Sequence, residues 1–196
     1  MMYVIEAGAN DGLFKSNTNW TDVHYDDITA ILIEPHPEMY DRLIQNRSEK
    51  NIFVNKCLVG PDYKFENIEL IEKNCVDQCS VLNIPEYNIP AENQIEGKKI
   101  RCSTSTLQQI LDDLNIHEVE KLYLDVEGYE SEVLKGIDYK KTNIKEMEIE
   151  AHFTRTNLKK EEEFDTISNI LSDYYNFLGE VKPNQEIKYI FGRKNV

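Results

Sequence analysis

Short apolar runs alternate along the chain with segments in which apolar residues recur every three or four positions. The short runs are typical of strands, and the recurring pattern is typical of helices that cover a sheet. We expect strands at residues 3–7, 30–33, 51–59, 66–71, 121–126, 145–151, 175–181 and 187–191. This alternation predicts an α/β fold with a mainly parallel sheet, in which the last two strands pair antiparallel.

Four helices are expected between these strands, each marked by a residue that begins or ends it. Pro37 suits the first turn of a helix, where its missing N–H leaves no hydrogen bond unmade. Thr106 and Gln109 have capping-box spacing, Gly136 ends a third helix, and Asn157 is expected to cap a fourth. The expected helices span residues 37–47, 106–114, 129–135 and 157–171.

Residues 73–99 interrupt the pattern. This stretch has little periodicity and contains Pro85, Pro90 and Gly97. Long irregular loops in compact domains are commonly lids or binding loops, so we expect residues 73–99 to form an acceptor or lid loop. A chain of 196 residues is long enough for one sizeable core, and we expect residues 1–196 to form a single domain.

The charge of the chain narrows the range of partners. Asp and Glu number 36 against 22 Lys and Arg, which gives a formal charge of −14. Because this excess repels phosphate groups and anionic lipids, we expect no nucleic acid partner. The opening residues lack a basic targeting region, and no apolar run approaches the roughly 18 residues that span a bilayer. We therefore expect no membrane span and a cytoplasmic location.

Four cysteines raise the question of a structural metal. Cys75 and Cys79 are separated by three residues, and no second pair with metal-ligand spacing follows. A structural zinc site needs a closed set of four ligands, so we interpret the cysteines as free thiols in a reducing compartment and expect no metal.

The first expected strand runs into a glycine-rich turn, residues 6–12. Gly8 and Gly12 permit a tight turn at which backbone amides approach a ligand closely. The spacing differs from the three-glycine fingerprint of dinucleotide sites, and the acidic Glu6 and Asp11 would repel a pyrophosphate. The turn therefore favours a cationic ligand.

Glu34 follows the second expected strand, 22 residues after Gly12. This is about the position at which a carboxylate accepts hydrogen bonds from ribose hydroxyls in nucleotide-binding α/β folds. Each of the two signals is weak alone, because an acidic residue after a strand is commonly only solvated. Their combination predicts a site for an adenosine that carries no phosphate.

A third motif, residues 122–130, delivers Asp125 and Glu127 to the same edge of the sheet. In this order, Glu-Ala-Gly-Ala-Asn-Asp-Gly, Leu-Ile-Glu-Pro-His-Pro and Leu-Asp-Val-Glu-Gly-Tyr-Glu resemble the FkbM-type S-adenosylmethionine-dependent methyltransferases. The resemblance extends from Tyr3 to about Phe153. It implies a doubly wound, Rossmann-like seven-stranded methyltransferase sheet, mostly parallel with an antiparallel C-terminal strand.

The resemblance also implies roles for particular residues. Glu6, Gly8, Asn10 and Gly12 would line the methionine end of S-adenosyl-L-methionine. Glu34 would hold the ribose of the cofactor, and Asp125 would stand near the methionine amino group or the methyl acceptor.

Four side chains are expected at the carboxyl edge of the sheet, where a base would take the proton of the acceptor. Asp125, Glu127 and His152 are the catalytic candidates, with Glu150 beside them; His152 is attractive because its ordinary pKa is near neutrality. A structural role for His152 is at least as compatible with the sequence. Asp125 and Glu150 suggest Mg²⁺, but two carboxylates do not make a coordination sphere.

The resemblance implies methyl transfer to a hydroxyl oxygen, with a sugar or glycan as the favoured acceptor. The alternative is a non-catalytic interaction or regulatory module on the same fold. A nicotinamide-dependent oxidoreductase ranks third, because the three-glycine fingerprint is absent. The chain begins almost at its first expected strand, without the helix that precedes it in many relatives. We therefore expect a second copy or another chain to cover surface near the site, and a homodimer is the form considered.

Overall fold

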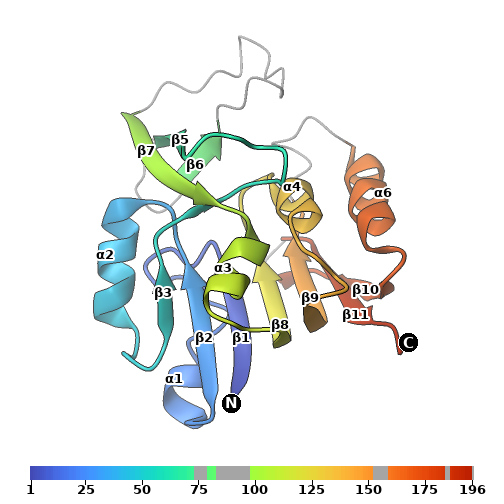
Figure 1. Cartoon of the computed structure of the whole chain (residues 1–196), viewed down its shortest axis with the longest axis horizontal. Helices are drawn as coiled ribbons and strands as arrows, with labels where there is room; N and C mark the ends of the chain where they lie inside the picture. The colour runs from blue at the N-terminus through green and yellow to red at the C-terminus, as the bar shows by residue number, and fades with distance from the viewer. Residues whose placement is uncertain (73–78, 83–97, 152–158, 184–185, 196) are drawn as a thin grey trace.

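The computed structural model describes residues 1–72, 79–82, 98–151, 159–183 and 186–195. Its centre is a seven-stranded sheet (Figure 1). Neighbouring strands lie in the order β10 (Tyr175–Val181), β11 (Lys188–Arg193), β9 (Asn143–Glu150), β8 (Glu118–Leu124), β1 (Met2–Ala7), β2 (Ile28–Ile33) and β3 (Ile52–Val54). β11 runs antiparallel to both of its neighbours, and the other pairs are parallel. This confirms the seven-stranded, mostly parallel methyltransferase sheet with its antiparallel C-terminal strand.

The sequence of each central strand fits its place in the sheet. All six residues of β2 are buried, as expected for a parallel strand covered on both faces. β1 lies between β2 and β8, with Ala7 opposite Ile33 on one side and Leu124 on the other. The strand order reverses at β1, and open α/β sheets bind ligands in the crevice at such a switch point. The residues that follow β1, β2 and β8 therefore meet at one edge.

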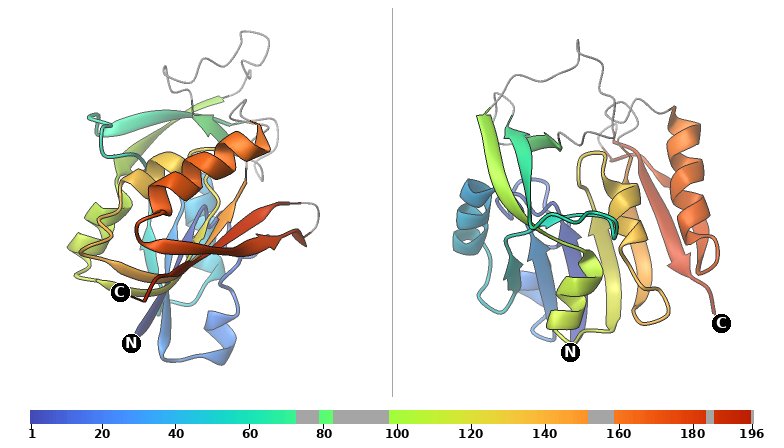
Figure 2. Two further views of the ribbon diagram at one scale, coloured as in Figure 1. Left: turned by 90° about the vertical axis from the view of Figure 1, so that its right-hand side faces the viewer. Right: turned by 45° about the horizontal axis from the view of Figure 1, so that its top comes forward.

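Helices cover both faces of the sheet (Figures 1 and 2). The larger apolar cluster joins the sheet to α3 (Leu107–Asp113), α4 (Glu130–Lys135) and α6 (Lys160–Leu171). On the opposite face, α2 (Pro37–Asn46) inserts Leu43 against Val4 and Leu32, and the four-residue α1 (Thr21–His24) lies beside β2. Burial of apolar side chains on both faces fixes the register of the sheet.

Helix boundaries follow the expected caps in most cases. The Thr106 and Gln109 capping box is present at α3, and Gly136 is the C-cap residue of α4. At α2, Nδ1 of His36 accepts hydrogen bonds from the amides of Glu38 and Met39, so His36 is a capping residue. α6 begins at Lys160, later than expected, and Asn157 lies outside the described residues. α1 was not predicted, because its four residues are too few to show a helical period.

A second, four-stranded sheet lies above the carboxyl edge of the first (Figures 1 and 2). Its strands occur in the order β4 (Cys57–Leu58), β7 (Lys98–Ser105), β5 (Asn67–Glu72) and β6 (Cys79–Leu82).

This second sheet corrects two sequence predictions. The strand expected at residues 51–59 is divided into β3 and β4, which belong to different sheets. Residues 73–99 are not one irregular loop, because they contain β6 and the first two residues of β7. The remainder, residues 73–78 and 83–97, lies outside the described residues. β7 was missed because only Ile100 and Cys102 are buried, which leaves a weak apolar alternation.

Candidate functional site

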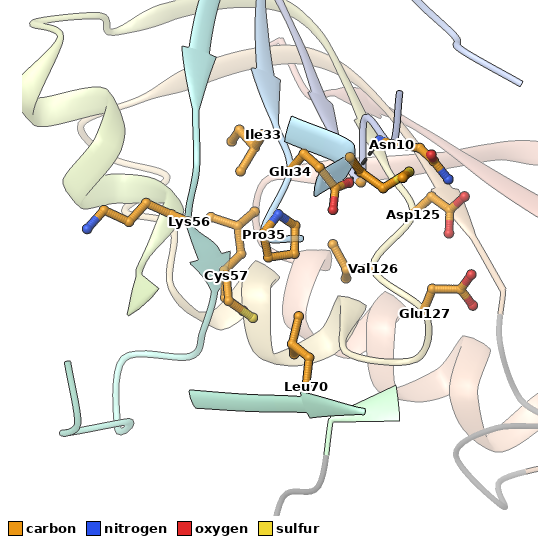
Figure 3. Close-up of a pocket in the computed structure, with 13 residues that line it drawn as sticks. Asn10, Ile33, Glu34, Pro35, Lys56, Cys57, Leu70, Asp125, Val126 and Glu127 are labelled. Carbon is orange, nitrogen blue, oxygen red and sulfur yellow. Dashed lines mark hydrogen bonds between the residues drawn. The ribbon is translucent and has the colours of Figure 1, made fainter. Parts of the chain in front are cut away.

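A cleft opens at the carboxyl edge of the seven-stranded sheet (Figure 3). The ends of β1, β2 and β8 line it, and Cys57, Leu58 and Leu70 contribute from the second sheet. The lining residues are Gly8, Asn10, Ile33, Glu34, Pro35, Met39, Lys56, Cys57, Leu58, Leu70, Asp125, Val126 and Glu127.

Gly8 makes the close approach of two strand ends possible. Its φ is +88°, and a Cβ atom at this position would lie 1.9 Å from the carbonyl oxygen of Asp125. The amides of Gly8 and Ala9 both donate to the carbonyl of Ile33, at 3.0 and 3.1 Å. The turn after β1 is thus held between the ends of β2 and β8, and only glycine fits there.

Glu34 is a buried carboxylate in the centre of the cleft (Figure 3). Its two oxygens accept hydrogen bonds from the amides of Asn10 and His36, each at 2.8 Å. Burial raises the pKa of Glu34 to about 7; the two amide bonds oppose this shift, and the charge of Asp125 adds to it. The protonation of this carboxyl therefore changes near neutral pH.

Asp125 and Glu127 lie on the turn that follows β8, and Figure 3 draws them on the side of the cleft opposite Lys56 and Cys57. The amide of Asp125 donates to the carbonyl of Ala7 at 3.0 Å, which continues the pairing of β8 with β1. Glu127 has a φ of +60°, an uncommon value for a residue with a side chain. Two carboxylates thus stand beside each other at one end of the cleft.

Apart from Lys56, the residues at the other end of the cleft are apolar. Ile33 and Met39 lie on the β2 side, and Leu58 and Leu70 close the cleft from the second sheet. Cys57 is a buried free thiol, and burial raises its pKa far above the ordinary range, so it behaves as an apolar wall residue. Such a surface suits a flat, uncharged ring.

Glu6 and Gly12 do not line this cleft. The carboxylate of Glu6 accepts hydrogen bonds from the Ser16 hydroxyl at 2.9 Å, the Asn17 amide at 2.6 Å and the Thr18 hydroxyl. Gly12 lies against the side chains of Leu43 and Arg47. Glu6 therefore holds residues 16–18 by hydrogen bonds, and Gly12 packs against Leu43 and Arg47. Both residues act on the backbone of residues 10–18 and not on the cleft. The expected cofactor residues that do border the cleft are Gly8, Asn10, Glu34 and Asp125.

Two other expected residues are not among those that line the cleft: one lies outside the described residues, and the other ends a strand. His152 falls in residues 152–158, which the structure does not describe. Glu150 ends β9 and is not among the lining residues. Lys15 pairs with Glu186, which is the main cause of its raised pKa, and the charges of Glu150 and Asp125 contribute. A lysine is therefore within electrostatic reach of the acidic end.

Sequence reasoning missed several residues that form the site. Lys56, Cys57 and Leu58 were missed because the strand expected at residues 51–59 placed them inside a strand, whereas in the structure they follow the end of β3. Leu70 was missed because its place depends on the second sheet. Asn55 was also missed: its side-chain amide donates to the Glu34 carbonyl at 2.8 Å and fixes the start of the turn.

Two further features concern metals and membranes. Within the described ranges, no three His, Cys, Asp or Glu side chains gather closely enough to hold a metal ion. The described part of the chain also contains no helix with the length and apolar character needed to cross a bilayer.

The strand order and the cleft at the end of β1 together define a Rossmann-like methyltransferase fold. The family model of the methyltransferase FkbM domain matches residues 6–178, which is most of the chain. The protein therefore belongs to the FkbM methyltransferase family. A search of curated proteins returned no match to the chain.

Proposed function

We propose that this protein is an S-adenosylmethionine-dependent O-methyltransferase that acts on a hydroxyl of a sugar or glycan. The observation that carries the proposal is Glu34, a buried carboxylate that faces the cleft next to the glycine turn. Membership of the FkbM family supports methyl transfer as the reaction.

The residues of the cleft fit the parts of S-adenosylmethionine. A carboxylate has about four acceptor positions, and the two amide bonds to Glu34 leave capacity for two ribose hydroxyls. The apolar end suits the adenine ring. Gly8, Asn10 and Asp125 would hold the methionine end, where a carboxylate favours the amino group and the sulfonium charge. When bound, the cofactor supplies a methyl group activated by its positively charged sulfur.

The chain supplies the groups that would orient a hydroxyl acceptor. The carboxylates of Asp125 and Glu127 accept hydrogen bonds, so either one can align a hydroxyl and take its proton as the oxygen is methylated. His152 stays a sequence prediction for the same task. The second sheet contributes Cys57, Leu58 and Leu70 to the lining, so side chains without charge replace water along that side of the cleft.

The charge around the cleft supports a neutral, hydroxyl-rich acceptor. Among the lining residues, Asp125, Glu127 and Glu34 are acidic against one basic residue, Lys56, and the whole chain carries −14. A phosphorylated acceptor would be repelled by this field, whereas sugar hydroxyls donate hydrogen bonds to carboxylates. The acceptor proposal rests on this charge and on the sequence resemblance.

Calorimetric titration with S-adenosylmethionine and S-adenosylhomocysteine tests the cofactor proposal. We expect micromolar binding by the wild-type protein, and loss of binding in Glu34→Ala. Glu38→Ala is the matched control, because Glu38 is an exposed carboxylate on the neighbouring helix that pairs with Arg42. A folded wild-type protein that binds neither compound would contradict the proposal and favour a non-catalytic module.

The acceptor is tested in a second experiment. The protein is incubated with S-adenosylmethionine carrying a labelled methyl group and a panel of neutral mono- and oligosaccharides. Label should pass to a sugar oxygen, and mass spectrometry of the product locates it. Transfer to amines or phosphorylated acceptors in preference to sugars would refute the acceptor class while leaving the cofactor proposal intact.

A further inference from the structure

The turn between β8 and α4, residues 125–129, has a backbone that needs support. Glu127 and Gly128 both have positive φ, +60° and +102°. Glycine adopts this conformation readily, but a residue with a side chain such as Glu127 does so at a cost that its surroundings must offset. The turn carries both Asp125 and Glu127 to the cleft, so its conformation determines where these carboxylates lie.

Glu130 supplies this support from the first residue of α4. Its side chain is buried, with 2% relative exposure. One carboxylate oxygen, Oε1, accepts hydrogen bonds from the amide of Val126 at 3.0 Å and from the amide of Gly128 at 3.1 Å. These two amides flank Glu127, so the carboxylate of Glu130 bridges the turn across its left-handed residue.

The opposite end of the turn is fixed by β1. The Asp125 amide donates to the Ala7 carbonyl, and the Asp125 carbonyl packs against Gly8. Asp125 is therefore anchored to the sheet, whereas Val126 and Gly128 are held by Glu130. Without the Glu130 carboxylate, these two amides would lose the acceptor that the fold provides for them, and Glu127 would lose the bonds that flank it.

We propose that Glu130 is a positioning residue that holds the Asp125–Gly128 turn in the conformation that presents Asp125 and Glu127 to the cleft. The catalytic part of this inference rests on the proposed function. The conformational part stands on the two hydrogen bonds and the burial of Glu130 alone. Glu130 itself is not among the residues that line the cleft.

Hydrogen exchange tests the conformational part without any enzyme assay. In Glu130→Ala we expect the Val126 and Gly128 amides to exchange about tenfold faster, because each loses its acceptor. Glu130→Gln keeps a side-chain oxygen and should exchange within about threefold of wild type. Glu132→Ala is the control: Glu132 lies on the same helix, pairs with Lys135 and is partly exposed, so the turn should not change.

Kinetics with an accepted sugar and cofactor titration test the catalytic part. We expect Glu130→Ala to lower kcat about 10- to 100-fold, to change the affinity for S-adenosylhomocysteine less than about threefold, and to be rescued largely by Glu130→Gln. Faster exchange with unchanged kcat and acceptor KM would overturn positioning. Faster exchange across the whole sheet, with a lowered Tm, would instead assign Glu130 a purely structural role.

The two proposals fail in different ways. Unchanged exchange of the Val126 and Gly128 amides in Glu130→Ala overturns the role of Glu130, whether or not the protein methylates anything. Absence of cofactor binding by the wild-type protein overturns the proposed function, and the exchange experiment then still decides whether Glu130 holds the turn.

Discussion

Glu6 and Glu34 are buried carboxylates at the ends of neighbouring strands, β1 and β2, but they serve different purposes. Burial raises the pKa of both. Glu6 accepts hydrogen bonds from Ser16, Asn17 and Thr18, all on the segment that follows its own strand. Glu34 is bound by backbone amides, and it borders the cleft.

This difference separates a structural carboxylate from a binding one. The partners of Glu6 come largely from side chains that fold over it, so its acceptor capacity is used within the protein. Glu34 is oriented by amides that do not depend on side-chain identity, and its remaining capacity faces a cavity. The partners of a buried charge thus indicate its role better than its burial or its pKa.

The largest effect is expected on the Glu6 side, from loss of Arg47. Its buried guanidinium bonds Asp22 at 2.7 Å and the Thr18 carbonyl at 3.0 Å, and it lies 3.8 Å from Glu6. Although burial acts to raise the pKa of Asp22, hydrogen bonds from Arg47 and its neighbours lower it to about 2. Arg47→Ala leaves these carboxylates without their cation and should lower the free energy of unfolding by about 3–5 kcal/mol.

Urea unfolding of Arg47→Ala, compared with Arg42→Ala, measures this effect. Arg42 forms an exposed pair with Glu38, so its loss should cost less than about 1 kcal/mol. Equal losses of unfolding free energy in the two variants would show that the contacts of Arg47 with Glu6, Asp22 and Thr18 do not stabilise the fold.

Gly8 lies between the two regions, and Gly8→Ala should disturb both. The new Cβ would overlap the Asp125 carbonyl, a backbone atom that cannot move without the end of β8, and φ is positive. We expect a loss of about 2–4 kcal/mol in unfolding free energy and a clear loss of cofactor affinity. Gly179→Ala is the control for a positive φ without overlap, because φ there is +151° and a Cβ meets nothing within 4 Å. A stable Gly8→Ala variant with normal binding would contradict the packing described.

The sequence predicted the strands of the main sheet because their apolar residues are continuous or alternate strongly. It also brought Gly8, Glu34 and Asp125 to one edge, since residues after parallel strands must meet there. It did not separate Glu6 from Glu34, because both are acidic residues at the end of an apolar strand. Only the side-chain partners, supplied by residues 16–18 and by Arg47, distinguish them.

The second sheet was predictable only in part. β5 was expected, but β7 pairs with it through long-range contacts that a weak alternation does not reveal. The apolar wall formed by Leu70 was therefore missed, and so was the support that Glu130 gives to the turn.

The homodimer stays a prediction, which analytical sedimentation tests.

Isosteric substitutions separate the roles of the two carboxylates. Glu34→Gln should weaken cofactor binding about 10- to 100-fold, because ribose hydroxyls lose a charged acceptor. Its unfolding free energy at pH 8 should change by less than about 1 kcal/mol, because removal of a buried charge offsets the loss of one of the two amide hydrogen bonds that Glu34 accepts. Glu6→Gln should do the reverse: a loss of about 1–2 kcal/mol in stability, with cofactor affinity changed less than about twofold. Calorimetry measures the cofactor affinity of both variants, and urea unfolding measures their stability.

The smallest expected effect is a pH dependence that belongs to Glu34 alone. Because its pKa is about 7 in the folded protein and the ionised form binds ribose best, affinity for S-adenosylhomocysteine should rise about tenfold from pH 6 to pH 8. Stability linked to this group has the opposite sign: the raised pKa favours the folded state at low pH, and that contribution is lost as pH rises through about 7. Glu34→Gln should abolish both trends, whereas a slope that persists in Glu34→Gln would assign the titration to another group.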